Sequence, residues 1–484
     1  MREKGLEKET PECGESDLCK GEEFGAENLE IYFHGNVREN NRIRVSIDRI
    51  SALPDCLLVH IISLLGMKKA ASTSILGKRW QLLWTELPSL QFDSYGWAKS
   101  KESEITSDFV AWVNRIIATR RGNYLEKLKV TFKYEDCFST DVDNWIQFAL
   151  ESKVKEVSLE MNNSQDFYIL HEMIYSNSSL TSLYLEGCIL DPQRTIKWWS
   201  LTKLEISGVN LPQSVVEKIL SGCPVLKFLD LSECYGFTCL EINSQNLRQL
   251  QIRDSEGDES EGFLQISAPY ITNLSLWLYP MGRQINLKDI SSLVSANIDF
   301  IEPFWDIIIP EKVLSSTKEI FEKIHHVKEL ELCPEPLKVL AALVLNGWQL
   351  PKYKLRCLEV DEIYGGGQTI PGILDLLESS PDIETLVMNS YDPESLDHDW
   401  APLARDNLVC DLLHLKTIKM YELANPNLGG EPMLTLARIL LKRAPVLEEM
   451  DICLHIEDTN VFVNIGQTLL NYPRSSPKAV IDLY

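Results

Sequence analysis

The chain has 484 residues, a formal net charge of −24 and 44% hydrophobic residues. This length predicts about three globular units of ~150 residues each, or one elongated repeat array. The negative charge argues against binding nucleic acids, which requires a basic surface to neutralise phosphates, and against attraction to anionic membranes. No apolar run reaches the ~20 residues that cross a bilayer, and residues 1–10 are too charged for a signal peptide. We therefore expect a cytoplasmic or nuclear protein.

The first 46 residues are rich in charged side chains and poor in large apolar ones. Such a segment cannot bury enough apolar surface to offset the entropy lost on ordering. Residues 1–46 are therefore predicted to form a disordered acidic tail. The character of the sequence changes at Asp48, where large apolar residues begin to recur.

Residues 50–83 carry apolar residues at helical spacing. Pro54 suits the first turn of a helix, where its missing N–H is not needed, and Gly66 is the expected end of that helix. The apolar stripe of this helix consists of Leu57, Ile61, Leu64 and Leu65. A second short helix is predicted over 68–73, and a third from the spacing of Leu76, Trp80 and Leu83. Three short helices bury little surface alone, so this module is expected to need a partner over its apolar face.

From about residue 100 the sequence repeats the pattern apolar-x-x-apolar-x-apolar. The five clearest copies begin 21, 25, 21 and 24 residues apart, within the roughly 20–29 residues typical of leucine-rich repeats. These copies are Leu180-Leu183-Leu185, Leu201-Leu204-Ile206, Leu226-Leu229-Leu231, Leu247-Leu250-Ile252 and Ile271-Leu274-Leu276. Weaker copies are Leu125-Leu128-Val130, Val154-Val157-Leu159, Leu293-Ala296-Ile298, Val327-Leu330-Leu332, Leu355-Leu358-Val360, Ile383-Leu386-Met388, Leu415-Ile418-Met420 and Leu447-Met450-Ile452. Each copy predicts one strand of a curved parallel sheet, with ~4.8 Å between neighbouring strands.

Helices are expected between the later strands, where the spacing stretches to about 30 residues. Residues 373–379 and 433–443 have this character, and Pro381 and Pro445 follow where each helix must already have ended. Cys188 and Cys234 stand three residues past the last apolar position of their repeats. A small buried side chain at that point can bond backbone groups as the chain leaves the strand.

Two segments of the N-terminal module resemble a known motif. Residues 48–55 read Asp-Arg-Ile-Ser-Ala-Leu-Pro-Asp and residues 72–80 read Ser-Thr-Ser-Ile-Leu-Gly-Lys-Arg-Trp. Together they resemble the F-box of plant F-box/leucine-rich-repeat proteins. The chain departs from that family at 65–67, where Leu-Gly-Met replaces a proline-containing turn, and at Gly77, where serine is usual. The segments similar to the FBD region at the end of many such proteins are 353–360, 370–381 and 383–386.

The repeats and this resemblance together predict an α/β fold. An N-terminal three-helix F-box would be followed by a curved leucine-rich-repeat solenoid with a parallel sheet and helices. After the tail, the expected domains are the F-box at 47–92, the solenoid at 100–345 and an FBD-like region at 346–484 that continues the solenoid.

In the proteins that this chain resembles, the F-box binds a Skp-type adaptor that bridges to a cullin, and the repeats bind a protein target. The resemblance implies the substrate-recognition subunit of an SCF-type cullin–RING E3 ubiquitin ligase, a non-catalytic role that needs no cofactor. An F-box/leucine-rich-repeat interaction scaffold acting outside a ligase is the alternative. The residues expected to bind the adaptor, or to form the core of so small a module, are Leu53, Pro54, Leu57, Ile61, Leu65, Trp80 and Trp84.

Other features of the sequence do not indicate catalysis or metal binding. The 12 cysteines include no Cys-x-x-Cys pair, so free thiols and no metal site are expected. The acidic segment 254–261 misses the EF-hand ligand pattern, and the glycines at 365–367 lack a phosphate-binding motif. His325 and His326 have no acidic residue at a spacing typical of a metal site or a catalytic site. No hydrolase or kinase motif is present, so no enzyme is expected. Trp198 and Trp199 could belong to the core or to a binding surface.

Overall fold

The computed structural model describes residues 50, 52–95, 102–120, 122, 124–162, 166–254, 262–279, 282–301, 309–363, 369–390, 408–423, 431–454 and 459–484. Residues 53–484 form one compact unit. The predicted tail 1–46, the glycines at 365–367 and the acidic segment 254–261, apart from Asp254, lie outside the described residues. In the part of the chain that the structure describes, no helix is both long and apolar enough to span a bilayer.

The N-terminal module contains two α-helices, α1 (Asp55–Ser63) and α2 (Met67–Ser72). Pro54 is the N-cap residue of α1, one position before the first turn in which it was predicted. Helix α1 ends at Ser63, and Gly66 precedes α2 instead of ending α1. The third helical segment takes the form of two 3-10 helices, η1 (Thr73–Leu76) and η2 (Leu83–Glu86), in place of one α-helix. Gly77 adopts an extended backbone after η1, and residues 78–82 form turns, which interrupts the expected helical stripe.

A parallel sheet of 15 strands forms the body of the unit, in the order β1-β2-β3-β5-β7-β8-β10-β12-β14-β15-β16-β17-β18-β19-β20. Thirteen of these strands coincide with the repeat copies found in the sequence, which confirms the predicted α/β fold with a parallel sheet. Their bounds are β2 Lys127–Phe132, β3 Glu156–Met161, β5 Ser182–Glu186, β7 Lys203–Ser207, β8 Phe228–Ser232, β10 Gln249–Arg253, β12 Asn273–Leu278, β14 Ser295–Phe300, β15 Glu329–Leu332, β16 Cys357–Ile363, β17 Thr385–Ser390, β18 Thr417–Leu423 and β19 Glu449–Leu454.

The two edge strands, β1 (Ser89–Asp93) and β20 (Val480–Leu483), were not among the predicted strands. Strand β1 does follow the pattern through Leu87, Leu90 and Phe92, but it lies inside the segment assigned to the F-box. In β20, Lys478 occupies the place of the first apolar residue, so the pattern is broken there.

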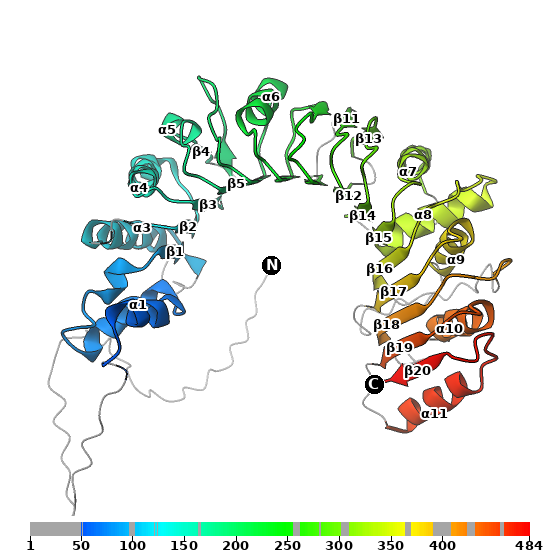
Figure 1. Cartoon of the computed structure of the whole chain (residues 1–484). Coiled ribbons are helices and arrows are strands. Elements are labelled where there is room, and N and C mark those ends of the chain that lie inside the picture. The colour runs from blue at the N-terminus through cyan, green and yellow to red at the C-terminus, as the bar shows by residue number, and fades with distance from the viewer. Residues whose placement is uncertain are drawn as a thin grey trace, which may run out of the picture. The chain divides into compact units, whose positions relative to one another are not determined.

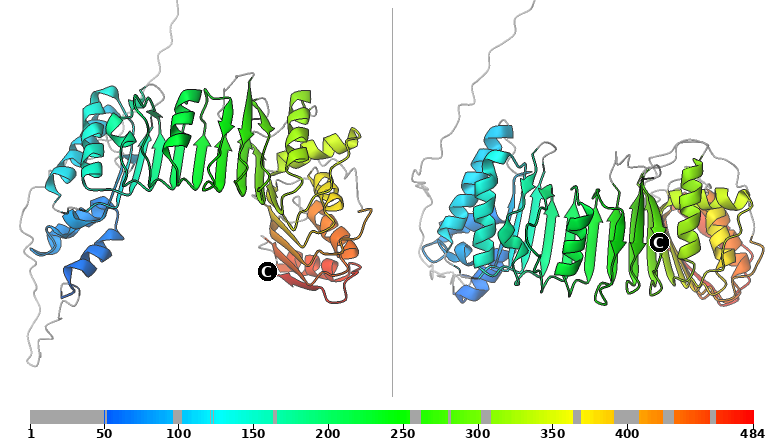
Figure 2. Two further views of the ribbon diagram at one scale, coloured as in Figure 1. Left: turned by 45° about the horizontal axis from the view of Figure 1, so that its top comes forward. Right: turned by 90° about the horizontal axis from the view of Figure 1, so that it is seen from above.

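Helices cover the outer side of the curved sheet, and the strands line its inner side (Figure 1). The helices are α3 Glu102–Thr119, α4 Ser139–Glu151, α5 Glu172–Tyr175, α6 Gln213–Gly222, α7 Glu311–Lys323, α8 Pro334–Leu345, α9 Ile370–Ser379, α10 Glu431–Arg443 and α11 Thr459–Leu470. Helices α9 and α10 confirm the two predicted from the later spacings. In the middle of the array, short strands stand on the outer side between α5 and α7 (Figure 2). These are β9 Cys239–Glu241, β11 Phe263–Ser267 and β13 Gln284–Leu287, while β4 Tyr168–Ile169 pairs with β6 Cys188–Ile189.

The core lies between the sheet and the outer layer. Alternate strand residues such as Leu183 and Leu185 are fully buried there, and the residues between them are half-exposed on the inner side. Cys188 and Cys234 are buried as predicted, and the Cys234 thiol lies 3.3 Å from the carbonyl oxygens of Ile206 and Ser232. Each repeat therefore contributes one layer of apolar side chains to a continuous core, and the repeats with Cys188 and Cys234 add a small buried thiol.

Candidate functional site

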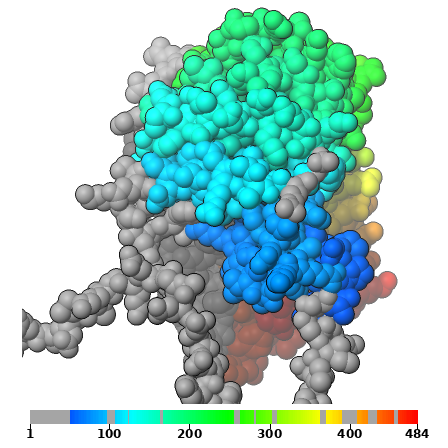
Figure 3. All heavy atoms as spheres, turned by 90° about the vertical axis from the view of Figure 1, so that its left-hand side faces the viewer, coloured from blue at the N-terminus to red at the C-terminus, as the bar shows by residue number. Residues whose placement is uncertain are grey.

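Several large apolar side chains of the N-terminal module are exposed to solvent, Ile50 and Leu82 among them, and we call the six on α1, its following turn and η1 the exposed apolar set. They are Leu57, Ile61, Leu64 and Leu65 of α1 and its following turn, with Ile75 and Leu76 of η1. In Figure 3 the N-terminal module, in blue, lies next to the first repeats, in cyan, at the near end of the described repeat array. Exposed large apolar side chains concentrated in one short segment are typical of a protein-binding surface.

The opposite side of this module forms its core. Leu58 and Ile62 of α1 are fully buried, and Trp80 and Leu83 join them. The α1 helix therefore has one face toward the core and a second apolar face toward solvent. Such an arrangement is costly unless another chain covers the second face.

The structure separates the seven predicted adaptor residues into two groups. Exposed residues are Pro54, Leu57, Ile61 and Leu65, and Leu53 is partly buried. Trp80 is buried in the core, and the indole N–H of the half-buried Trp84 donates to the Gln81 carbonyl oxygen at 3.0 Å. Sequence reasoning omitted Leu64, Ile75 and Leu76 from this group. Leu64 was already in the predicted helical stripe, and adjacent apolar residues at 75 and 76 were the available signal for the other two.

An ion pair holds the two F-box-like segments together. Arg79 donates through Nε and Nη2 to Asp55 Oδ1, at 2.8 and 2.5 Å, and through Nη2 to the Leu53 carbonyl oxygen at 2.6 Å. The contact joins the first turn of α1 to the turn before η2. Because both charged side chains are in contact with solvent, the main effect of this ion pair is to fix the geometry of the two segments, and its net stabilisation is about 0–1 kcal/mol.

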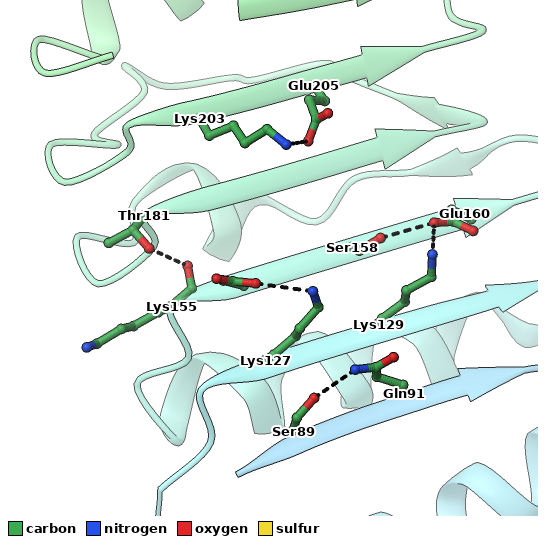
Figure 4. Close-up of polar contacts among 11 residues, drawn as sticks. Ser89, Gln91, Lys127, Lys129, Lys155, Ser158, Glu160, Thr181, Lys203 and Glu205 are labelled. Carbon is green, nitrogen blue, oxygen red and sulfur yellow. Dashed lines mark hydrogen bonds and ion pairs between the residues drawn. The ribbon is translucent and has the colours of Figure 1, made fainter. Parts of the chain in front are cut away.

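The inner face of the sheet is the second candidate surface, and lysines neutralise carboxylates in its N-terminal part. Lys129 pairs with Glu160 at 2.5 Å and Lys203 pairs with Glu205 at 2.8 Å; both contacts are drawn as dashed lines in Figure 4. Lys127 pairs with Glu156 at 3.3 Å. Partial burial raises the pKa of Glu160, but hydrogen bonds from Lys129 and neighbouring hydroxyls outweigh it and hold that pKa below its usual value. This part of the face is charged but locally balanced.

Carboxylates crowd together further along the same face, across β15, β16 and β17. Asn389 donates to Glu359 at 3.3 Å and also to Asp361. Partial burial, and after it the charges of Asp361 and Glu359, raises the pKa of Glu331 to about 7. Burial and Asp361 also raise the pKa of Glu359. This part of the inner face therefore has a negative potential that would favour basic groups of a partner.

Aromatic side chains lie between these two parts. Lys203 Nζ is 5.2 Å from the ring centre of Phe228, and the Arg253 guanidinium is 5.1 Å from that of Trp277. Both rings are on the half-exposed inner side of their strands. Aromatic and arginine side chains are enriched among residues that dominate protein-binding energy.

The two tryptophans left open by the sequence have different environments. Trp198 is fully buried, and its indole N–H donates to the Ile174 carbonyl oxygen at 2.8 Å, whereas Trp199 is exposed. At the end of α7, His325 Nδ1 is hydrogen-bonded to the carbonyl oxygen of Glu322, and His326 Nδ1 to that of Lys323. These contacts give both histidines a structural role.

Comparison with known proteins agrees with the repeat architecture. The model of the leucine-rich-repeat domain described as At1g61320/AtMIF1 matches residues 116–452. The chain is 31% identical to the putative F-box protein At1g49610 of Arabidopsis thaliana, over 72% of this chain and 86% of that protein. It is 30% identical to F-box/LRR-repeat protein At3g03360 of the same plant, over 71% of this chain and 70% of that protein. F-box/FBD/LRR-repeat protein At1g13570, also from Arabidopsis, is 24% identical over 90% of this chain and 98% of its own length.

Proposed function

Since the chain belongs to the plant F-box/leucine-rich-repeat protein family, we propose that it is the substrate-recognition subunit of an SCF-type cullin–RING E3 ubiquitin ligase. In this role its F-box binds a Skp-type adaptor, which links it to a cullin, and its repeats bind a protein target. The chain then performs no covalent chemistry. It raises the concentration of the target near the ubiquitin-carrying enzyme. Its place of action is the cytoplasm or the nucleus.

The observation that carries this proposal is the exposed apolar set. Leu57 and Ile61 of α1, and Leu65 in the turn after it, lie in solvent, whereas Leu58 and Ile62 of the helix are fully buried. Fully burying one such side chain contributes roughly 1.5–3 kcal/mol. An adaptor that covers this face would therefore supply the apolar environment that the module cannot provide for itself.

The residues expected to bind the adaptor have distinct roles in this proposal. Leu57, Ile61 and Leu65 would contact the adaptor directly, next to Leu53 and Pro54 at the start of α1. Trp80 supports the helix from inside, because it is buried. Trp84 would contribute only its exposed edge. The assignment of the domains is part of the same proposal: F-box at 47–92, repeats at 100–345 and FBD-like repeats at 346–484.

The inner face of the sheet is the surface that we assign to the protein target. It combines ion-paired charges, the aromatic rings of Phe228 and Trp277, and the crowded carboxylates around Glu331. A long surface with an uneven distribution of charge and aromatic groups favours a particular partner over others.

Reconstitution from purified components tests the proposal. The full chain is immobilised and offered a Skp-type adaptor together with a cullin, and the Leu57→Ala/Ile61→Ala variant is treated in the same way. A matched control, Leu345→Ala/Leu413→Ala, removes two apolar side chains that are exposed elsewhere. We expect the original chain and the control to retain both proteins and the α1 variant to retain neither. Retention of adaptor without cullin would indicate the scaffold role, and equal retention by the α1 variant would refute the assigned surface.

A further inference from the structure

A cavity of about 560 Å³ lies outside both candidate surfaces, where α4 meets the segment that contains β4 and α5. In Figure 1 these elements are neighbours on the outer side of the sheet. Its lining residues include three aromatic ones, Tyr134, Phe167 and Tyr168. The volume falls within the roughly 300–1,000 Å³ of small-molecule sites. The cavity is therefore large enough for a small organic ligand.

The polar lining of this cavity is acidic. Four carboxylates, those of Asp136, Asp143, Glu172 and Asp191, line it, and its lining residues include no lysine or arginine. A nearby cation, Lys218, donates to the carbonyl oxygen of Pro192 and is not among the lining residues. The cavity therefore contrasts with the inner face around Glu160, where lysines balance the acids.

His171 also lines the cavity and caps the start of α5. Its Nδ1 accepts the backbone N–H of Met173 at 3.2 Å, so this side chain is held in place by the helix that it caps.

Hydrogen bonds hold the walls of the cavity in position before any ligand binds. The Tyr168 hydroxyl donates to Asp143 Oδ1 at 2.5 Å, and Glu172 accepts the backbone N–H of Gln193 at 2.5 Å. The rings of Tyr134 and Tyr168 meet edge to face, with 5.7 Å between their centres. Asp191 is held through its backbone N–H, which donates to the Tyr175 hydroxyl at 3.1 Å. A site that is already ordered loses little entropy on binding.

The electrostatic environment of Tyr134 agrees with a negative cavity. Burial raises the pKa of this phenol to about 12, and the charges of Asp136, Asp143 and Asp166 add to the effect. Anionic ligands are disfavoured by the same charges. Aromatic faces and carboxylates together are the usual partners of ammonium groups, through cation–π attraction and ion pairing.

From the cavity, its aromatic walls and its uncompensated carboxylates, we propose that this site binds a small organic cation with an ammonium group and a short apolar body. The ammonium group lies against the rings and between the carboxylates, and the apolar body contacts Ile169 and Leu170. This binding is separate from adaptor docking, so it stands or falls independently of the proposed ligase role.

The test compares choline with 3,3-dimethylbutanol, its neutral analogue of nearly the same shape, by calorimetric titration of the full chain. We expect saturable one-to-one binding of choline, and binding of the neutral analogue at least about tenfold weaker. Asp136→Asn/Asp191→Asn should weaken choline binding at least tenfold. Phe167→Leu, which keeps the charge and removes one ring, should weaken it about threefold.

A matched control separates this site from general attraction to an acidic protein. Glu241→Gln/Glu329→Gln makes the same change in charge at exposed positions away from the cavity and should leave choline binding unchanged. Circular dichroism of each variant checks that it is folded. The proposal is overturned if choline shows no saturable binding, if the neutral analogue binds as well, or if the control weakens choline as much as the cavity variant.

Discussion

Replacing Ile75 and Leu76 with alanine should weaken adaptor binding by about 100-fold and leave the fold intact. Their side chains are 85% and 63% exposed in the free chain. Covering both therefore buries the equivalent of about one and a half whole side chains. At about 2 kcal/mol for each, the adaptor gains about 3 kcal/mol, and 1.4 kcal/mol corresponds to a factor of ten in Kd. Alanine keeps part of this gain, so about 2–3 kcal/mol should be lost.

Isothermal titration of the purified chain with a Skp-type adaptor measures this effect. The same variant should change the free energy of unfolding by no more than about 0.5 kcal/mol, because the replaced side chains make few contacts in the free chain. The variant Leu345→Ala/Leu413→Ala serves as the matched control, since it also removes two exposed apolar side chains. A Kd that stays within threefold of the original, or one that rises equally in the control, would show that η1 does not contact the adaptor.

Three further predictions concern stability. Trp80→Ala should lower the free energy of unfolding of the N-terminal module by about 3–5 kcal/mol, because Trp80 is buried in its core, and should speed hydrogen exchange across α1. In Gly372→Ala the new Cβ would lie 2.3 Å from the Leu337 carbonyl oxygen, so α8 and α9 must move apart. Urea unfolding should show a loss of about 1–3 kcal/mol in the free energy of unfolding. Gly66→Ala is the control, because the space around its Cβ is open, and it should show no such loss. Partial burial and neighbouring carboxylates raise the pKa of Glu331 from 4.5 to about 7 in the folded chain. The folded chain therefore has its full stability below pH 4.5, where Glu331 is neutral, and loses stability as the pH rises toward 7. The free energy of unfolding of Glu331→Gln, relative to that of the original chain, should therefore rise by about 1 kcal/mol between about pH 5 and pH 8, a value reduced for partial exposure. If the two chains differ by the same free energy at both pH values, this prediction is wrong.

Much of the repeat fold follows from one local pattern. Three apolar residues at positions i, i+3 and i+5 place the last two on the buried side of a strand, as with Leu183 and Leu185. Among the 15 strands of the described sheet, the pattern is broken only in β20, where the exposed Lys478 stands at the first position and the strand itself is only partly buried. The other edge strand, β1, follows the pattern but lies in the segment assigned to the F-box.

The candidate sites were less predictable, because they depend on packing between segments. Helical spacing identified the stripe of α1, but it could not show that Trp80 turns inward, since residues 78–82 form turns instead of a helix. The crowding around Glu331 depends on the pairing of β15 with β16, which sets Glu331 beside Glu359. The cavity near Tyr168 is built from the first turns of α4 together with loops and short elements, and the loops and short elements carry no periodic signal.

The most direct test of the ligase role is the ubiquitination state of proteins held by the repeats. Proximity labelling in plant cells with the original chain and with Leu57→Ala/Ile61→Ala identifies partners that both capture, and ubiquitin remnants on those partners are then quantified. We predict shared partners that carry more ubiquitin with the original chain and that accumulate with the variant. Shared partners with equal ubiquitin and equal abundance in both cases would contradict the ligase role.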